Sequence, residues 1–369
     1  MDFIDLRSQY QALRSSIDTR IGRVLEHGQY ILGPEVAEVE AQLAAFTGAR
    51  YCATVASGTE ALLIALMALG VGPGDEVITT PFTFVATVEV IVLVGATPVF
   101  VDVEADTGNI DASRLAAAIT DRTRAIIPVG LYGQPSEMDV INAVATRSAN
   151  IAVIEDGAQS FGATYHGRKS CNLSNIGCTS FFPSKPLGCY GDGGAIFTND
   201  ASIDQACREI RVHGQSARYH HTRIGVAGRM DTIQCAVLLA KLERFPWELE
   251  RRTALSTLYS ARIRAAGARA EPLARRPDRA SAWAQYTVLI DDRDAVQRRM
   301  LELGIPTAVH YPRAMHQQPA YEIFCAHAAL PVSEDLARRV LSLPFSADLD
   351  EAQLGHVVKA LARATIGSG

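Results

Sequence analysis

Short apolar runs alternate with longer amphipathic stretches between about residue 50 and residue 200. Because parallel strands need a long crossover between them, this alternation predicts a mostly parallel, seven-stranded sheet of the α/β class with helices on both faces. The expected strands are Tyr51–Val55, Glu76–Thr79, Thr97–Val101, Ala125–Val129, Ile151–Ile154, Thr179–Phe182 and Ala195–Thr198. The expected helices are Arg7–Glu26, Gly58–Leu69, Val85–Leu93, Ala112–Ile119, Glu137–Ser148 and Ile203–Val212. Ligands of such sheets bind at the carboxyl ends of the strands, where candidate site residues should therefore lie.

The second half of the chain predicts a smaller unit. A pattern over Thr232–Arg252 predicts a long helix that leads out of the first domain. A strand pattern at Gln285–Ile290 and a helix pattern at Ala295–Leu303 then predict a smaller α/β domain. A chain of 369 residues is long enough for two domains. We expect a large domain over residues 1–240 and a small C-terminal domain over residues 241–369.

Charge and hydropathy exclude several classes of protein. The formal net charge of −5 leaves no basic excess with which to neutralise nucleic-acid phosphates. The longest apolar run, Val85 to Val101, is interrupted by Glu89, Gly95 and Pro98, so no transmembrane helix is predicted. The N-terminus has no basic segment followed by an apolar one, so no signal peptide is expected. These features favour a cytoplasmic protein that binds neither nucleic acid nor membrane.

The cysteines indicate thiols rather than disulfides or a metal site. Seven are present, an odd number, at positions 52, 171, 178, 189, 207, 235 and 325. No two of them form a C-x-x-C pair, the spacing typical of zinc sites. We therefore expect small buried apolar side chains in a reducing compartment, and no metal.

The first candidate for chemistry is the end of the expected strand at Ile151–Ile154. The strand is followed by Glu155 and Asp156, and Gln159 comes about one turn later. A carboxylate at this edge of a sheet can face a bound ligand. Considered alone, Asp156 is more typical of a residue that caps the N-terminus of a helix.

The second candidate is Lys185, which follows the expected strand Thr179–Phe182 and enters a glycine-rich loop, Leu187 to Gly194. Desolvation and nearby positive charge lower the pKa of a lysine and make its amine nucleophilic. The glycines let the backbone pass close to a flat or phosphorylated ligand. A lone lysine in such a loop is more often structural, but Asp156, 29 residues upstream at another strand end, favours a site.

The third candidate is the turn from strand to helix at Ala56–Glu60. Free N–H groups and the dipole of a helix N-terminus bind phosphate well, and the Thr59 and Ser180 hydroxyls would add donors. An ordinary capping turn would have the same sequence. The presence of a phosphate seat, a lysine and a carboxylate in one domain favours a shared site for a phosphorylated cofactor.

Several of these stretches recur in a known family, in the order that the family has them. They are Leu32–Val36, Ser57–Leu62, Gly72–Ile78, Phe82–Phe84, Glu155, Asp156, Gln159, Ser180–Lys185, Gly191–Ala195 and His310–Pro312. On these motifs the chain resembles the sugar aminotransferases of the DegT/DnrJ/EryC1/StrS family. The resemblance covers nearly the whole chain. It implies the type I fold of aminotransferases dependent on pyridoxal 5'-phosphate, a homodimer, and L-glutamate as amino donor.

Within the family, Cys171–Ser174, Pro183–Tyr190 and Arg218–His221 resemble one branch most. Its enzymes add the 3-amino group of UDP-2,3-diacetamido-2,3-dideoxyuronic acids for O-antigen or lipopolysaccharide. Most of the family has asparagine after the cofactor lysine, whereas this chain has Pro186, as that branch does. The resemblance thus implies UDP-2-acetamido-2-deoxy-3-oxo-glucuronate as the amino acceptor.

The resemblance also implies roles for the candidate residues. Lys185 would bind the cofactor covalently and carry the proton, and Asp156 would pair with the pyridinium nitrogen. The other implied cofactor contacts are Gln159 to the ring 3-oxygen, Phe84 (with Phe82 as second choice) stacked on the ring, and Gly58, Thr59 and Ser180 at the phosphate. The implied substrate contacts, several of them from the neighbouring subunit, are Gln29, Tyr30, Ser184, Arg229, His310 and Tyr311.

Some of these residues could instead have a purely structural role. Arg229 is suited to bind a carboxylate bidentately, but an arginine is also typical of a surface ion pair. His310–Pro312 is equally consistent with a turn in the small domain. In one respect the chain departs from the family: Ala227 occupies the position of an asparagine that reaches the partner's cofactor phosphate. Alanine cannot donate that hydrogen bond, so a water or Arg229 would substitute, or the cofactor would be held less tightly.

Three rival functions follow from the same sequence. Sugar dehydratases of this fold have histidine in place of the lysine, so Lys185 favours transamination. Only the branch motifs distinguish the predicted enzyme from an aminotransferase that acts on a 4-keto or dTDP-linked sugar. A regulatory or scaffold protein without catalysis is disfavoured, because Lys185, Asp156 and Gln159 are all present and no helix-turn-helix or basic patch is visible.

Overall fold

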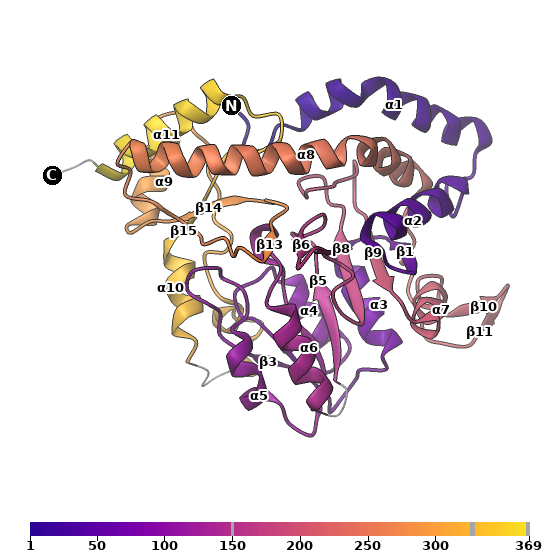
Figure 1. The fold of residues 1–369 in the computed structure, drawn as a ribbon. Coiled ribbons are helices and arrows are strands. Elements are labelled where there is room, and N and C mark those ends of the chain that lie inside the picture. Colours follow the sequence, from indigo (N-terminus) through magenta and orange to yellow (C-terminus); the bar gives the residue numbers. More distant parts are fainter. Residues whose placement is uncertain (149–150, 325–328, 367–369) are drawn as a thin grey trace.

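The computed structural model describes residues 1–148, 151–324 and 329–366 (Figure 1). A seven-stranded sheet forms its centre, in the order β1-β9-β8-β5-β4-β2-β3. Its strands are β1 (Tyr51–Val55), β2 (Glu76–Thr79), β3 (Thr97–Phe100), β4 (Thr123–Ile127), β5 (Ala152–Asp156), β8 (Ile176–Ser180) and β9 (Gly194–Thr198). β9 runs antiparallel to both its neighbours, and the other adjacent strands are parallel. The predicted seven-stranded, mostly parallel sheet is confirmed.

Both faces of this sheet are buried. Along β2, Val77 packs into the core beneath one helical layer and Ile78 into the core beneath the other; Ile154 and Val153 of β5 divide in the same way. Strands buried on both faces are mostly apolar, which is why they read as short apolar runs in the sequence. The helices of this part are α2 (Pro34–Thr47), α3 (Gly58–Ala68), α4 (Ala86–Leu93), α5 (Leu115–Ala118), α6 (Met138–Arg147) and α7 (Ala201–Ile210).

Several expected element boundaries differ from those of the structure. The strand expected at Thr179–Phe182 is β8, which ends at Ser180. The Ser180 hydroxyl accepts a hydrogen bond from the Phe182 N–H at 3.2 Å, which turns the chain out of the sheet. The helix expected at Ala112–Ile119 is a 3-10 turn, Ala112–Arg114, followed by the short α5.

The long helix α8 (Thr232–Ala265) continues well beyond its expected end at Arg252. Its later turns carry Leu255, Tyr259 and Ile263, which are fully buried in the C-terminal core and so extend the helix. α8 runs across the whole molecule in Figure 1, and α1 (Leu6–His27) lies along its first half, where Ile17 packs on Val237. Residue 240, the predicted domain boundary, lies inside α8; that division stays a prediction.

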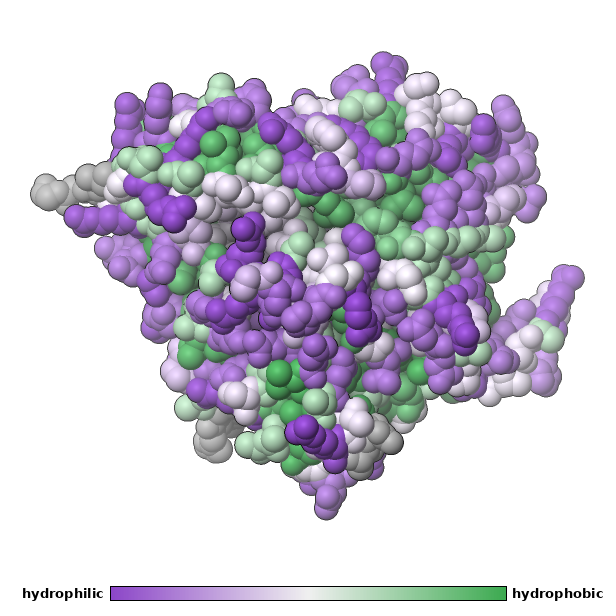
Figure 2. All heavy atoms as spheres, viewed as in Figure 1, coloured by the Kyte–Doolittle hydropathy of each residue, from purple (hydrophilic) through white to green (hydrophobic). Residues whose placement is uncertain are grey.

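The C-terminal part is built on the antiparallel sheet β12-β14-β15. Its elements are β12 (Glu271–Pro272), β14 (Tyr286–Leu289), α9 (Arg293–Glu302), α10 (Pro331–Arg339), β15 (Val340–Leu343) and α11 (Glu351–Ile366). The 3-10 turns in the described chain are Ala112–Arg114, Leu131–Gly133, Met315–Gln317 and Glu322–Phe324. Two minor sheets pair β6 (Thr164–Tyr165) with β7 (Arg168–Lys169) and β13 (Arg279–Ala280), and β10 (Gln215–Ala217) with β11 (His220–His221). The β10–β11 hairpin projects from the body (Figures 1 and 2).

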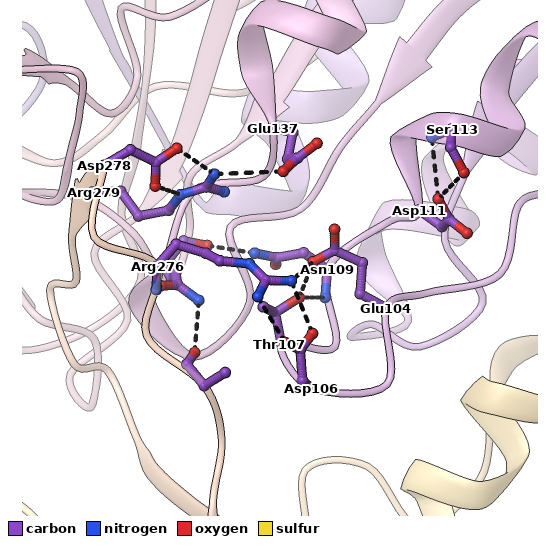
Figure 3. Close-up of polar contacts among 12 residues, drawn as sticks. Glu104, Asp106, Thr107, Asn109, Asp111, Ser113, Glu137, Arg276, Asp278 and Arg279 are labelled. Carbon is purple, nitrogen blue, oxygen red and sulfur yellow. Dashed lines mark hydrogen bonds and ion pairs between the residues drawn. The ribbon is translucent and has the colours of Figure 1, made fainter.

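Ion pairs join the two parts beside the sheet edge. Arg276, ahead of β14, meets Asp106 at 2.7 Å and Glu104 at 3.4 Å, both in the loop after β3 (Figure 3). Arg279 pairs with Asp278 at 2.7 Å and approaches Glu137 at 3.8 Å. These contacts hold the C-terminal segment against the carboxyl ends of the strands, where the candidate site lies.

Two further sequence expectations concern thiols and membranes. Six cysteines are buried and free, and Cys325 lies outside the described residues. Over the described ranges, no helix combines the length and the apolar character that crossing a membrane requires.

Candidate active site

Asp156 is the last residue of β5 and is buried at the carboxyl edge of the sheet. One of its oxygens accepts a hydrogen bond from the Thr87 hydroxyl at 2.8 Å, and the other accepts one from the Ala158 N–H at 3.1 Å. Burial raises the pKa of this carboxyl, whereas the two hydrogen bonds and the charge of Lys185 oppose that rise. No helix begins after Asp156, so the alternative of a helix cap is wrong.

Thr87 is a site residue that sequence reasoning missed. It lies on α4 and is fully buried, and its hydroxyl also meets that of Thr83 at 2.9 Å. The available signal was a threonine near the start of a helix whose only other polar residue is Glu89. That signal does not reveal the partner, because Asp156 is 69 residues away in sequence.

Lys185 lies in the loop between β8 and β9, within electrostatic range of Asp156. Burial lowers the pKa of its amine, and the charge of Asp156 partly offsets the effect. The loop folds back on itself through hydrogen bonds from the Cys189 N–H to the Phe181 carbonyl and from the Phe181 N–H to the Gly193 carbonyl, both 2.7 Å. A Cβ on Gly188 would lie 2.6 Å from the Phe182 carbonyl oxygen, so glycine is required there.

The expected phosphate seat forms where α3 begins at Gly58. Ser57 caps this helix by accepting a hydrogen bond from the Glu60 N–H at 3.1 Å. Within the described chain, the N–H groups of Gly58 and Thr59 have no hydrogen-bond acceptor. A Cβ on Gly58 would lie 2.5 Å from the Cβ of Ser180, so the end of β8 meets the start of α3 directly. The structure thus brings Gly58, Thr59 and Ser180 together as donors.

Gln159 links the large part to the C-terminal part. Its side-chain oxygen accepts a hydrogen bond from the Tyr132 N–H at 2.8 Å, and its amide nitrogen donates to the Tyr311 hydroxyl at 3.2 Å. Tyr132, which sequence reasoning also missed, donates its own hydroxyl to the His310 carbonyl. Burial raises the pKa of Tyr311 and the charge of Asp156 adds to the rise, so the phenol stays protonated.

The two aromatic candidates differ in accessibility. Phe84 is 51% exposed, and its ring centroid lies 6.1 Å from that of Tyr311. Phe82 is fully buried, and its ring meets Tyr311 edge-on at 6.4 Å. Only Phe84 therefore offers a ring face to a ligand.

His310 lies within electrostatic range of Lys185. Burial, together with the charge of Lys185, lowers the pKa of its imidazole to about 4, so the ring is neutral at physiological pH. Its Nδ1 lies 2.9 Å from the Ser342 hydroxyl of β15.

The remaining substrate candidates form a separate group. Tyr30 accepts a hydrogen bond from the Thr232 N–H at 3.0 Å, which places the exposed Gln29 and Tyr30 beside the chain that follows Arg229. The Nε of Arg229 is buried and has no hydrogen-bond partner among the described residues. Ser184, half-buried, adjoins Lys185 in sequence. No hydrogen bond or ion pair among the described residues joins Gln29, Tyr30 or Arg229 to Lys185 or Asp156.

The first group could hold pyridoxal phosphate. The desolvated lysine matches the aldehyde of this cofactor, and the buried carboxylate matches its ring nitrogen. The exposed aromatic ring face matches the plane of the cofactor ring. The helix N-terminus, where an added Cβ would be crowded, matches the phosphate. On the carboxyl edge of a mostly parallel sheet, this arrangement defines an aminotransferase of the pyridoxal-phosphate-dependent fold type I. The family model of the DegT/DnrJ/EryC1/StrS aminotransferases matches residues 11–362, and the chain belongs to this family.

Three known proteins show how far the similarity reaches. The UDP-2-acetamido-2-deoxy-3-oxo-D-glucuronate aminotransferase of Pseudomonas aeruginosa is 53% identical over 361 residues, covering 98% of this chain and 99% of that protein. A DegT DnrJ EryC1 StrS aminotransferase from Brucella abortus superposes with a TM-score of 0.95 at 39% identity, over the full length of both chains. NtdA from Bacillus subtilis, solved with bound cofactor PMP, gives 0.89 at 28% identity and covers 96% of this chain and 82% of its own.

Proposed function

We propose that the chain transfers the amino group of L-glutamate to the 3-keto group of UDP-2-acetamido-2-deoxy-3-oxo-glucuronate. The observation that carries the proposal is that Lys185 lies within electrostatic range of both buried Asp156, at the carboxyl edge of the sheet, and His310. The 53% identity to the P. aeruginosa enzyme supports the choice of substrate. The product would serve O-antigen or lipopolysaccharide synthesis in the cytoplasm.

Each candidate site residue would have its own role in the reaction. Bound pyridoxal phosphate supplies the carrier for the amino group and the electron sink that acidifies the reacting carbon. The Lys185 amine is the general acid and base, because desolvation lowers its pKa towards physiological pH. Asp156 would hold the proton of the ring nitrogen, Gln159 would bind the ring 3-oxygen, and Phe84 would cover the ring. Gly58, Thr59 and Ser180 would bind the phosphate.

Arg229 is our candidate for the uronate carboxylate. A buried guanidinium nitrogen without a partner is costly, and a carboxylate would satisfy it bidentately. On the side of Lys185, the sugar would contact Ser184, His310 and Tyr311. From the group that contains Arg229, it would contact Gln29 and Tyr30. Since no hydrogen bond or ion pair between described residues joins Arg229 to Lys185, we propose that a homodimer completes each site with residues from both subunits.

A complementation experiment tests the shared site. The Lys185→Ala and Arg229→Ala variants should each be inactive, and a mixture that has exchanged subunits should regain up to about one quarter of the wild-type activity. Random exchange makes half of the dimers hybrid, and each hybrid holds one fully wild-type site. The activity of mixed and unmixed samples is compared, with exchange verified by differently tagged subunits. Absence of recovery after verified exchange would show that each site is built within one chain.

The choice of substrate is tested with a panel of nucleotide-linked keto sugars. Protein converted to the pyridoxamine form is mixed with each sugar, and return of the absorbance of lysine-bound cofactor is followed. The UDP-3-keto uronate should be fastest. A faster 4-keto or dTDP-linked sugar would establish the alternative aminotransferase. Loss of a sugar hydroxyl without amination would establish a dehydratase, and no response to glutamate would favour a regulatory protein.

Ala227 makes a separate prediction about cofactor retention. It is exposed and stands where the family asparagine would donate to the partner's phosphate. A hydrogen bond to a charged group is worth about 1.5–3 kcal/mol, or roughly ten- to more than a hundredfold in affinity. The covalent bond to Lys185 masks this loss, but the pyridoxamine form has no such bond. Ala227→Asn should therefore slow cofactor loss after glutamate treatment, measured as cofactor retained through a desalting column. Equal retention by the two proteins would mean that a water or Arg229 already fills the role.

A further inference from the structure

A chain of buried hydroxyl groups leads from the C-terminal sheet to His310. Thr287 of β14 and Ser342 of β15 are paired across the sheet, and their hydroxyl oxygens lie 2.9 Å apart. The Ser342 hydroxyl lies 2.9 Å from Nδ1 of His310. On its other side, the backbone of Ser342 forms two hydrogen bonds with Ala308, of 2.8 and 3.1 Å. The segment that carries His310 is thus attached to β15 through main chain and side chain.

The order of protons along this chain follows from counting donors. Each hydroxyl has one proton to donate, and the Thr287 hydroxyl has no other hydrogen-bond partner among the described residues. Because Thr287 is buried, leaving its proton without an acceptor would cost free energy. Thr287 must therefore donate to Ser342, and Ser342 must donate to Nδ1 of His310. A neutral imidazole that accepts at Nδ1 carries its proton on Nε2.

Nε2 is the nitrogen that remains for a ligand. It is turned away from Ser342 by the geometry of the ring, and it has no hydrogen-bond partner in the described parts of the chain. Burial and Lys185 keep the ring neutral. A neutral donor can bind a sugar oxygen without placing a second positive charge beside Lys185, which would weaken that amine as a base.

We propose that Thr287 and Ser342 are positioning residues that fix the proton of His310 on Nε2 and present this N–H to an oxygen of the keto sugar. The inference rests on the proposed function, because it takes the sugar as the ligand. It assigns a role to two residues that lie outside the sequence motifs and need not touch the substrate. The amino donor half of the reaction does not involve the sugar, so it should not depend on this hydroxyl chain.

The experiment compares Ser342→Ala, which removes the hydroxyl that donates to Nδ1, with Ser346→Ala as the matched control. Binding of the unreactive 3-hydroxy analogue UDP-2-acetamido-2-deoxyglucuronate to the holoenzyme is measured by calorimetry. Ser342→Ala should bind about tenfold more weakly, the effect of one hydrogen bond, and Ser346→Ala should bind as wild type does. The rate of the glutamate half-reaction should be unchanged in both. Side-chain ¹⁵N spectra of histidine-labelled holoenzyme report the tautomer directly.

Ser346 is a suitable control because it is buried near the same sheet, and its hydroxyl makes no hydrogen bond to any described residue. Thr287→Val should weaken binding less than Ser342→Ala does, because Ser342 can still donate to Nδ1 when the Thr287 hydroxyl is absent. Wild-type affinity in Ser342→Ala, or equal weakening by Ser342→Ala and Ser346→Ala, would overturn the inference. So would a slower glutamate half-reaction, since that points to general damage. If the wild-type protein failed to bind the analogue yet responded to glutamate, the proposed substrate itself would be wrong.

Discussion

Replacing Lys185 with alanine should lower turnover by at least about 10²–10⁴-fold, the usual contribution of general acid and base catalysis. The structure gives the reason: burial lowers the pKa of this amine beside Asp156, so a larger fraction of it is unprotonated and able to accept a proton than in an exposed lysine. No other lysine is coupled to Asp156 among the described residues. Absorbance spectra and single-turnover rates of each half-reaction provide the measurement.

The variant should still fold and bind the cofactor without a covalent bond, because the donors at Gly58, Thr59 and Ser180 remain. Lys359→Ala is the control, since Lys359 is exposed on α11. Its turnover should match that of wild type. Near-normal transamination by the Lys185 variant would show that another group moves the proton, and the central assignment would be wrong.

Replacing Asp156 with asparagine should slow both half-reactions by about tenfold to more than a hundredfold. Asparagine is nearly isosteric and can still accept the hydrogen bond from Thr87, but it cannot stabilise a protonated ring nitrogen. A hydrogen bond between charged groups is worth about 1.5–3 kcal/mol, and each 1.4 kcal/mol in the barrier changes the rate about tenfold. Both half-reactions should be affected because both need the ring as electron sink.

Asp102→Asn separates this effect from loss of stability. Asp102 is also buried, but its side chain accepts hydrogen bonds from Val332 and Ser333 and from none of the candidate site residues. That variant should lower the free energy of unfolding and leave the rate constants of the folded enzyme near wild type. Unchanged half-reaction rates in Asp156→Asn would mean that a different carboxylate faces the ring nitrogen.

Much of the site could be predicted because its parts are local. Asp156 ends an apolar strand, and Gly58 begins a helix after another strand; each position is visible in the periodicity and in the residue types alone. The sheet edge then brings these positions together without further information, because parallel strands share their carboxyl ends. The position of Lys185 after a strand was also predictable, although that strand ends at Ser180 rather than at Phe182. The side-chain hydroxyl that turns the chain there has no signature in hydropathy.

The sequence by itself determined the class of fold, the order of the strands along the chain, and the lysine and carboxylate that a phosphorylated cofactor needs. These properties follow from runs of neighbouring residues, whose spacing and burial are set locally. Only the tertiary structure decided that Thr87 supports Asp156, that Tyr132 joins Gln159 to the His310 segment, and that Thr287 and Ser342 reach His310. These pairings are made by single hydroxyl and amide groups far apart in the chain. Their partners become defined only when packing brings the elements to hydrogen-bonding distance.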